Sequence, residues 1–273
     1  MTSTVTRFAP SPTGLLHIGH AYSALYAAAA GDRFLLRTED IDQTRCRPAF
    51  EAAIFEDLAW LGLSWEQPVR RQSDHFNDYA DALARLDELG VLYRCICTRK
   101  QIAAEIAAAG AAPQGPDGPL YPGTCRHLDP ADVGDRPFAW RLNVTKALAL
   151  VDPAGLTWLE RRHGQQTADP ARHGDVVLAR KETPTSYHLS VTVDDAIQGI
   201  TLVTRGDDLR AATDIHRLLQ ALLGLPTPDY DHHPLLTDDA GQRLAKRDDA
   251  RSLRQYREDG LTPDDVRRMV GMA

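Results

Sequence analysis

The sequence contains no long apolar run, and its hydrophobic stretches fall short of the ~20 residues that a membrane span requires. Its N-terminus also lacks the charged and then apolar pattern of a secretory signal. Only four of the 273 residues are cysteines, so a disulfide framework is not expected. These absences argue against a membrane partner and predict a cytoplasmic protein, whose length suffices for one large or two modest domains.

The chain also lacks an excess of positive charge, because 38 acidic residues outnumber 31 lysines and arginines and leave a net charge of −7. Nucleic-acid-binding proteins usually carry a basic surface, so this balance argues mildly against such a partner. A basic face can nevertheless be local. The pairs Arg70-Arg71, Arg161-Arg162 and Arg267-Arg268 are candidates for one, although solvated surface is the simpler interpretation.

The most informative stretch runs from Arg7 to His20. Its β-rich start predicts a strand, PSPTG ends that strand, and a helix is predicted to begin near Ile18. His17, Gly19 and His20 therefore lie at a helix N-terminus, where free N–H groups and the helix dipole favour an anion such as phosphate. An isolated H-x-x-H is more often a pair of surface histidines, so this motif needs support from the rest of the chain.

Carboxylates follow the second predicted strand, residues 33–37. Glu39, Asp40 and Asp42 would lie at the carboxyl end of that strand, which is where ligands bind in open α/β sheets. A solvated, N-capping loop is the simpler interpretation and fits Asp40 and Asp42 well.

A candidate metal site lies further along the chain, where Cys95 and Cys97 form a C-x-C pair and Cys125 follows. Thiolates with this spacing are plausible ligands of a structural zinc ion, which needs a fourth ligand. His127 is the conventional choice, because Tyr121 would have to ionise a phenol with a pKa of ~10. Three reduced cysteines in a small insertion without metal are the alternative.

The remaining pattern predicts an α/β protein whose parallel sheet is interrupted by an insertion. Helices are predicted from Pro48 and from Ser73, and a last short helix from Thr262. Three strands are predicted after the insertion, where parallel pairing is expected to resume: Asp175–Arg180, Ser186–Val193 and Ile200–Thr204.

We therefore divide the chain into four parts. Residues 1–94 and 175–225 are the two halves of a nucleotide-binding catalytic domain. Residues 95–174 are a zinc-binding insertion subdomain, and residues 226–273 are a loop followed by a short helical C-terminus.

Tyr187 and Arg205 fall at the ends of predicted strands. An arginine offers a planar fork for a carboxylate, and a tyrosine hydroxyl adds a directional donor. Each alone would more often be a surface or core-edge residue. The basic loop Gln242–Arg247, which contains Lys246, would likewise usually be solvated.

The segment RFAPSPTGLLHIGH resembles the first signature of the class I aminoacyl-tRNA synthetases, and of their glutamyl branch in particular. RTEDID, the C-x-C and Y-x-x-x-C pattern and the loop around Lys246 resemble further motifs of that branch. In the loop, Arg243 and Ala245 replace a lysine and a serine of the second class I signature. The resemblance covers nearly the whole chain and implies a Rossmann-like parallel sheet, a zinc-binding insertion and a short C-terminal helical segment.

The resemblance also implies roles for individual residues. Glutamate would be contacted by the first loop, by the residue after the second strand and by two later residues: Arg7, Phe8, Ala9, Pro10, Ser11, Glu39, Tyr187 and Arg205. Glu39 would hold the ammonium group, whereas the arginine that binds each carboxylate stays open. ATP would be bound by His17, Gly19, His20 and Lys246, of which the histidines and the lysine would act in catalysis. Zinc would be bound by Cys95, Cys97, Tyr121 and Cys125.

Only residues 248–273 follow Arg247, whereas an ordinary glutamyl-tRNA synthetase would continue into an anticodon-binding domain. The resemblance is therefore strongest to truncated members of the branch, and it implies tRNA-independent activation of L-glutamate with ATP and Mg²⁺. Glutamate would then be transferred to queuosine in the anticodon loop of tRNA(Asp). A short synthetase that charges a tRNA 3′ end and a non-catalytic tRNA-binding module are the alternatives, and the oligomeric state stays open.

Overall fold

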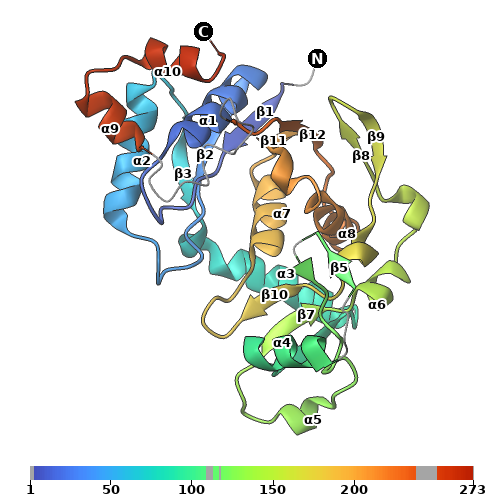
Figure 1. Cartoon of the computed structure of the whole chain (residues 1–273). Helices are drawn as coiled ribbons and strands as arrows, with labels where there is room; N and C mark the ends of the chain where they lie inside the picture. The colour runs from blue at the N-terminus through green and yellow to red at the C-terminus, as the bar shows by residue number, and fades with distance from the viewer. Residues whose placement is uncertain (1–2, 109–112, 117, 238–250, 273) are drawn as a thin grey trace.

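A computed structural model describes residues 3–108, 113–116, 118–237 and 251–272. A parallel sheet with helices packed against it forms one part of the molecule, and a smaller antiparallel sheet forms another (Figure 1). No helix of the described part is both long and apolar enough to span a bilayer.

The parallel sheet is built from two groups of strands that meet at β1. The first group has the order β1 (Val5–Phe8), β2 (Arg33–Thr38) and β3 (Glu66–Arg71). The second has the order β11 (Leu202–Gly206), β12 (Asp229–His233), β8 (Thr157–Glu160) and β9 (Gly164–Thr167), of which only β9 is antiparallel to its neighbour. The Thr201 N–H donates to the Val5 carbonyl at 3.1 Å and so places β11 beside β1.

Five helices accompany this sheet: α1 (Ile18–Ala30), α2 (Pro48–Trp60), α3 (Phe76–Glu88), α7 (Tyr187–Ile197) and α8 (Thr213–Leu223). The helices predicted from Ile18 and Pro48 are confirmed, and a 3₁₀ turn (Gln72–His75) precedes α3 where a helix was predicted from Ser73. The apolar faces of α3 and α8 are buried, as Tyr79, Leu86 and Ile215 illustrate with no exposed surface. Burial of these apolar faces stabilises the packing of the helices on the sheet, and this packing holds the strands of the site in place.

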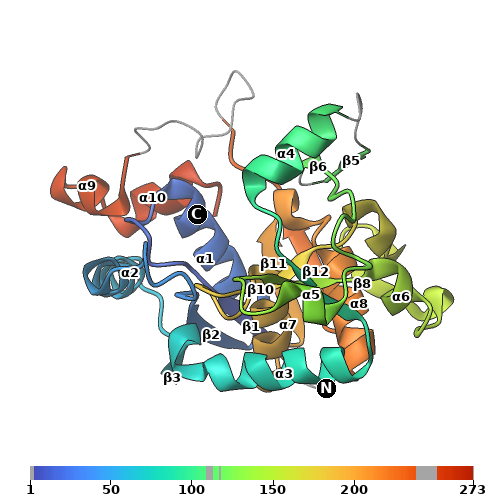
Figure 2. The ribbon, with the colours of Figure 1, turned by 90° about the horizontal axis from the view of Figure 1, so that it is seen from below.

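The insertion contributes β7 (Ala139–Leu142) to a second sheet, in which it pairs antiparallel with β10 (Val177–Arg180) and with β4 (Leu92–Cys95). Its other short elements are α4 (Arg99–Ala108), β5 (Gln114–Gly115), β6 (Gly118–Pro119), α5 (Pro130–Val133) and α6 (Val144–Leu148). Two helices near the C-terminus, α9 (Leu253–Glu258) and α10 (Pro263–Met269), lie on the opposite side of the molecule from α4 (Figure 2). Thr262 caps α10, as predicted.

Two strand predictions are wrong, one because the segment is helical and the other because the strand pairs in a different sheet. Ser186–Val193 is not a strand but the start of α7, because the Ser186 side chain accepts a hydrogen bond from the Leu189 N–H and caps a helix. Residues 177–180 do form a strand, but β10 pairs antiparallel with β7 rather than joining the parallel sheet. The smaller sheet therefore takes one strand from beyond the boundary expected at residue 174.

Candidate active site

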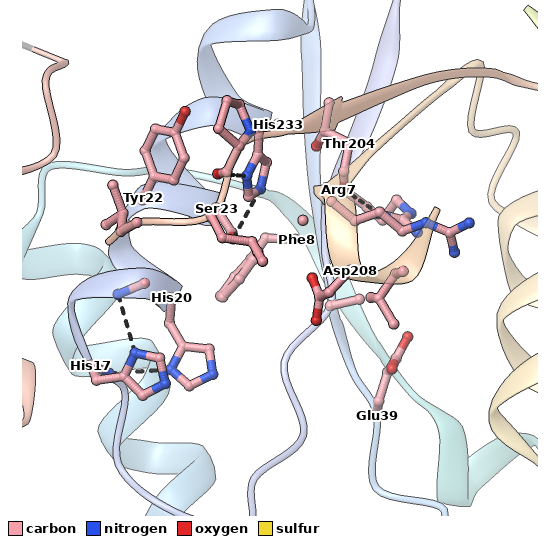
Figure 3. A pocket seen from close by; sticks show the side chains of 18 of the residues that line it. Arg7, Phe8, His17, His20, Tyr22, Ser23, Glu39, Thr204, Asp208 and His233 are labelled. Carbon is pink, nitrogen blue, oxygen red and sulfur yellow. Dashed lines mark hydrogen bonds between the residues drawn. The ribbon is translucent and has the colours of Figure 1, made fainter. Parts of the chain in front are cut away.

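The carboxyl ends of β1, β2 and β11 and the start of α1 surround a cavity of about 350 Å³ (Figure 3). Most of the predicted substrate and ATP residues line it: Arg7, Phe8, Ala9, His17, Gly19, His20, Glu39, Tyr187 and Arg205. Pro10 is buried beside the cavity and accepts the Glu39 N–H at 3.0 Å, whereas Ser11 is exposed. Lys246 lies outside the described residues.

His17 and His20 cap the N-terminus of α1 with their own rings. Nδ1 of His17 accepts the Gly19 N–H at 3.1 Å, and Nδ1 of His20 accepts the His17 N–H at 3.2 Å. Because Nδ1 is the acceptor in both rings, each neutral imidazole carries its proton on Nε2. Burial lowers the pKa of His17, and burial followed by the proximity of His17 lowers the pKa of His20 to about 3. The cavity thus holds two neutral N–H donors.

Gly19 favours this cap. A Cβ at position 19 would lie 3.1 Å from Cε1 and 3.2 Å from Nδ1 of His17, so the ring would have to shift by a few tenths of an ångström. The glycine therefore lets the imidazole fold back over the first turn of α1.

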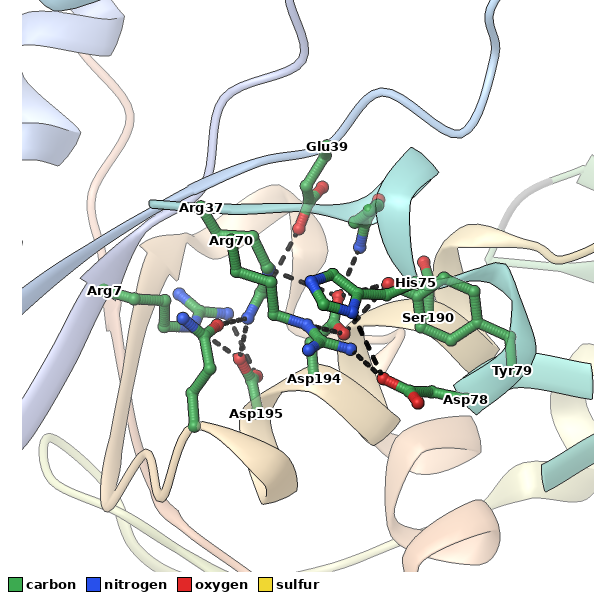
Figure 4. A network of polar contacts seen from close by, with 12 residues as sticks. Arg7, Arg37, Glu39, Arg70, His75, Asp78, Tyr79, Ser190, Asp194 and Asp195 are labelled. Carbon is green, nitrogen blue, oxygen red and sulfur yellow. Dashed lines mark hydrogen bonds and ion pairs between the residues drawn. The ribbon is translucent and has the colours of Figure 1, made fainter. Parts of the chain in front are cut away.

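A buried ion-pair network supports one wall of the cavity (Figure 4). Asp195 accepts hydrogen bonds from Arg7 Nε at 2.9 Å and from Arg37 Nη1 at 2.8 Å. Arg37 also contacts Glu39, with 3.2 Å between Nη2 and Oε1. Burial raises the pKa of Glu39, and Arg37 and Arg7 oppose that rise. The pKa of Asp195 is lowered, because the two arginines outweigh the opposing effect of burial.

Asp194 extends this network behind the site. Its carboxylate accepts hydrogen bonds from Arg70 Nε at 2.7 Å, Gln72 Nε2 at 2.8 Å and the Tyr79 hydroxyl at 2.9 Å. These contacts tie α7 to β3 and α3. The sequence analysis assigned no function to Arg37, Asp194 or Asp195, and the only signal for the two aspartates was a charged pair that follows the run Val191–Val193.

Arg205, which also lines the cavity, lies in a contrasting environment. Its guanidinium donates to His232 Nε2 at 3.0 Å, the Tyr187 hydroxyl at 3.3 Å, His216 Nδ1 at 3.2 Å and Thr213 Oγ1 at 2.7 Å. Burial, followed by Arg205 itself, lowers the pKa of His216 well below its usual range. Arg205 forms no ion pair with any carboxylate among the described residues, so its charge is available to an anionic ligand.

The predicted cysteines also meet. The sulfur atoms of Cys95, Cys97 and Cys125 lie within 4.8 Å of one another and form a group that could hold a metal ion. The Tyr121 oxygen lies 3.3 Å from the sulfur of Cys95 and 3.6 Å from that of Cys97, whereas His127 is exposed. The described geometry thus places the tyrosine, and not the histidine, beside the thiols.

Comparisons with known proteins agree with this fold. Residues 3–272 match the family described as tRNA synthetases class I (E and Q), catalytic domain. The glutamate tRNA ligase of Elizabethkingia meningosepticum, solved in complex with its amino acid, superimposes with a TM-score of 0.80 at 25% identity over 99% of this chain. The chain spans 61% of the length of that structure.

Curated relatives are also similar over most of the chain. The glutamyl-Q tRNA(Asp) synthetase of Rhodobacter capsulatus is 51% identical over 98% of this chain and 100% of its own length. Its namesake in Nocardia farcinica is 43% identical over 95% of this chain and 81% of its own length. Glutamate–tRNA ligase 1 of Methylococcus capsulatus is 36% identical, and the chain covers 59% of it. The chain therefore belongs to the class I tRNA synthetase family that contains the glutamyl and glutaminyl enzymes.

Proposed function

We propose that the protein activates L-glutamate with ATP and transfers the glutamyl group to queuosine in the anticodon loop of tRNA(Asp). The observation that carries this proposal is one cavity that combines an arginine with no carboxylate partner among the described residues, a buried carboxylate and two neutral histidines at a helix N-terminus. The names of the two glutamyl-Q tRNA(Asp) synthetases, which the chain matches over 100% and 81% of their own lengths, support the acceptor.

The cavity walls offer complementary charges to an amino acid. Glu39 would bind the ammonium group, because its carboxylate lies in the cavity and is held in place by Arg37. Arg205 and the Tyr187 hydroxyl would bind a carboxylate. Arg7 would contribute its remaining N–H groups, since Asp195 already neutralises its charge.

Activation needs positioning and charge stabilisation, and no enzyme nucleophile. An oxygen of the glutamate α-carboxylate attacks the α-phosphorus of ATP, the bond to the bridging oxygen breaks, and pyrophosphate leaves. The Nε2–H groups of His17 and His20 and the Lys246 ammonium would bind the phosphates. Mg²⁺ bound to ATP would neutralise part of the remaining charge.

Transfer completes the reaction at the same place. A ring hydroxyl of queuosine attacks the carbonyl carbon of the adenylate, an ester bond forms, and AMP leaves with the electron pair of the broken bond. The reacting base has to be splayed out of the anticodon loop to reach the cavity, as single-stranded loop bases readily are.

We also propose that the cysteine group holds one structural Zn²⁺. Three sulfurs and the Tyr121 oxygen would supply the four ligands of a tetrahedral site. When bound, the ion would crosslink β4 to the segment that carries Tyr121 and Cys125. It would have no part in the transfer chemistry.

Glutamate-dependent exchange of pyrophosphate into ATP tests the first half-reaction. We expect exchange without added RNA, because the side chains of the amino-acid site are already held by hydrogen bonds within the chain. Exchange that requires tRNA would contradict this. An inactive protein would instead favour a non-catalytic tRNA-binding module.

Radiolabelled glutamate tests the acceptor. We expect incorporation into an isolated tRNA(Asp) anticodon stem-loop with queuosine, and none into the same stem-loop with guanosine. The stem-loop has no 3′ acceptor end, so labelling it separates base modification from charging. Labelling of tRNA(Glu), abolished by periodate oxidation of its 3′ end, would identify a short glutamyl-tRNA synthetase instead.

A further inference from the structure

A buried carboxylate and a buried histidine lie directly behind Arg205. Glu160 ends β8 and His232 lies on β12, and both side chains are fully buried. Nδ1 of His232 lies 2.5 Å from Oε2 of Glu160, and the His232 backbone N–H donates to Oε1 at 3.1 Å. Both carboxylate oxygens therefore hold the same residue.

The proton positions in this group follow from the arginine. Guanidinium nitrogens only donate hydrogen bonds, so Nε2 of His232 must accept from Arg205 Nε, 3.0 Å away. The ring proton of a neutral His232 is then on Nδ1, where it is donated to Glu160. A protonated ring would instead point an N–H at the arginine, and burial, with Arg205 next in importance, lowers the pKa of His232 to about 3.

We propose that Glu160 and His232 are positioning residues for glutamate, acting through Arg205. Glu160 selects the tautomer of His232, and His232 presents a lone pair that fixes the plane of the guanidinium. The negative charge stays one residue away from the arginine, so Arg205 is oriented without a direct ion pair to any residue that the structure describes. This inference rests on the proposed function, in which Arg205 meets a substrate carboxylate.

Arg7 shows what a direct ion pair does instead. Its guanidinium contacts Asp195 through Nε at 2.9 Å and Nη2 at 3.3 Å, and it also donates to the Thr204 carbonyl. The two arginines thus lie at one cavity, but Arg7 is paired with a carboxylate and Arg205 is held by neutral groups. Since Glu160 is the last residue of β8, which pairs with β12, the segment that was predicted as an insertion helps to build the amino-acid site.

The variant Glu160→Gln tests the tautomer argument. An amide has one acceptor oxygen and one NH₂ donor, so it cannot accept both the His232 ring proton and the His232 backbone N–H. If the NH₂ faces Nδ1, the ring proton moves to Nε2. There it points at the Nε–H of Arg205, and the hydrogen bond between the two residues is lost. We expect the KM for glutamate in pyrophosphate exchange to rise at least tenfold, with the KM for ATP within twofold of wild type.

Asp175→Asn is the matched control. Asp175 is also a buried carboxylate that accepts a backbone N–H, from Val144 at 3.0 Å, together with side-chain donors from Tyr93 and Arg126. It does not line the cavity. We expect this variant to lower Tm and to leave the KM for glutamate unchanged. Equal changes in the KM for glutamate and for ATP in Glu160→Gln would reduce Glu160 to a structural role and overturn the proposal.

A second measurement is independent of activity. Long-range ¹H–¹⁵N correlation of the histidine rings in the resting protein should show His232 protonated on Nδ1, and a proton on Nε2 would overturn the inference. If Glu160→Gln does not fold, His232→Gln replaces it, because its amide oxygen can still accept from Arg205. Its KM for glutamate should then lie between those of wild type and His232→Ala, and equal values for the two variants would count against the lone pair.

Failure of the inference and failure of the proposed function give different results. A wild-type protein that shows no glutamate-dependent exchange contradicts the function, whereas the ring correlation still reports the tautomer. A wild-type protein that exchanges normally, with Glu160→Gln unchanged, contradicts only the positioning role.

Discussion

The parallel-sheet region and the cysteine-bearing insertion hold their side chains by different means. In the sheet region, the site is held in place by two large apolar clusters and by the buried ion pairs that Asp194 and Asp195 form with Arg37. In the insertion, the cysteine group packs only against half-buried neighbours, and none of the described residues of α4 is buried. Little apolar burial means little intrinsic stability, so we expect the part of the insertion around the cysteine group to depend on a metal crosslink and the sheet region not to.

The largest effect is expected when one thiolate ligand is removed. We expect purified wild-type protein to carry about one equivalent of zinc, and Cys97→Ser or Cys125→Ser to lose it. Hydrogen exchange should then become fast around the cysteine group, from Cys95 to Leu128 among the described residues, and stay slow in β1, β2 and β11. Metal analysis and exchange mass spectrometry measure both. Wild-type protein without zinc, when prepared without chelator, would break the comparison.

The next effect concerns catalysis in the sheet region. Lys246→Ala should slow pyrophosphate exchange about a hundredfold, because loss of one donor to developing charge costs ~3 kcal/mol. Glutamate binding, measured by calorimetry, should change little, since the proposed amino-acid contacts lie on β1, β11, α7 and the loop after β2. A comparable loss of glutamate affinity would mean that the lysine acts on the amino acid.

A smaller effect separates the two candidates for the fourth zinc ligand. Tyr121→Phe should weaken zinc binding, because it removes the oxygen next to Cys95 and Cys97. His127→Ala serves as the matched control and should retain wild-type affinity, since His127 is exposed. Competition with a chromophoric chelator gives both affinities. Loss of zinc in His127→Ala alone would show that the ligand assignment is wrong.

The last effect is the pH dependence of stability in the sheet region. Burial lowers the pKa of both His20 and His232 to about 3, below the usual value of ~6.5. The unfolded chain therefore binds more protons between these values, and the free energy of unfolding falls as the pH drops from ~6.5 towards ~3. Each histidine contributes at most ~1.4 kcal/mol per pH unit. Urea titrations at several pH values give the free energy of unfolding at each pH. This free energy should depend less steeply on pH in His20→Asn than in wild type, and an unchanged dependence would contradict the buried neutral state of His20.

The sequence was a good guide where the signal was local. The strand, turn and helix around His17 and His20 were predicted from neighbouring residues, and the three cysteines from their spacing. It failed for Ser186–Val193, where β-branched residues indicate a strand but Ser186 caps α7 and the helix packs into the core. Propensity is a weak guide when burial favours the other conformation.

Long-range pairing was the other source of error. The strand β10 was predicted, but nothing in its residues specifies β7 as its antiparallel partner. Arg37 and Asp195 are 158 residues apart, and Glu160 and His232 are 72 apart, so no spacing rule brings either pair together.

The sequence by itself determined the chemistry available to this protein: the two histidines at the start of α1, the carboxylate after β2, Arg205 and the thiols. Those features depend on residue type and on contacts within a few positions. The tertiary structure alone decided the charge balance of the cavity, with Arg7 neutralised by Asp195 and Arg205 held by neutral groups. Electrostatic energy depends on distance in space and on burial, and both are fixed only when distant segments pack together.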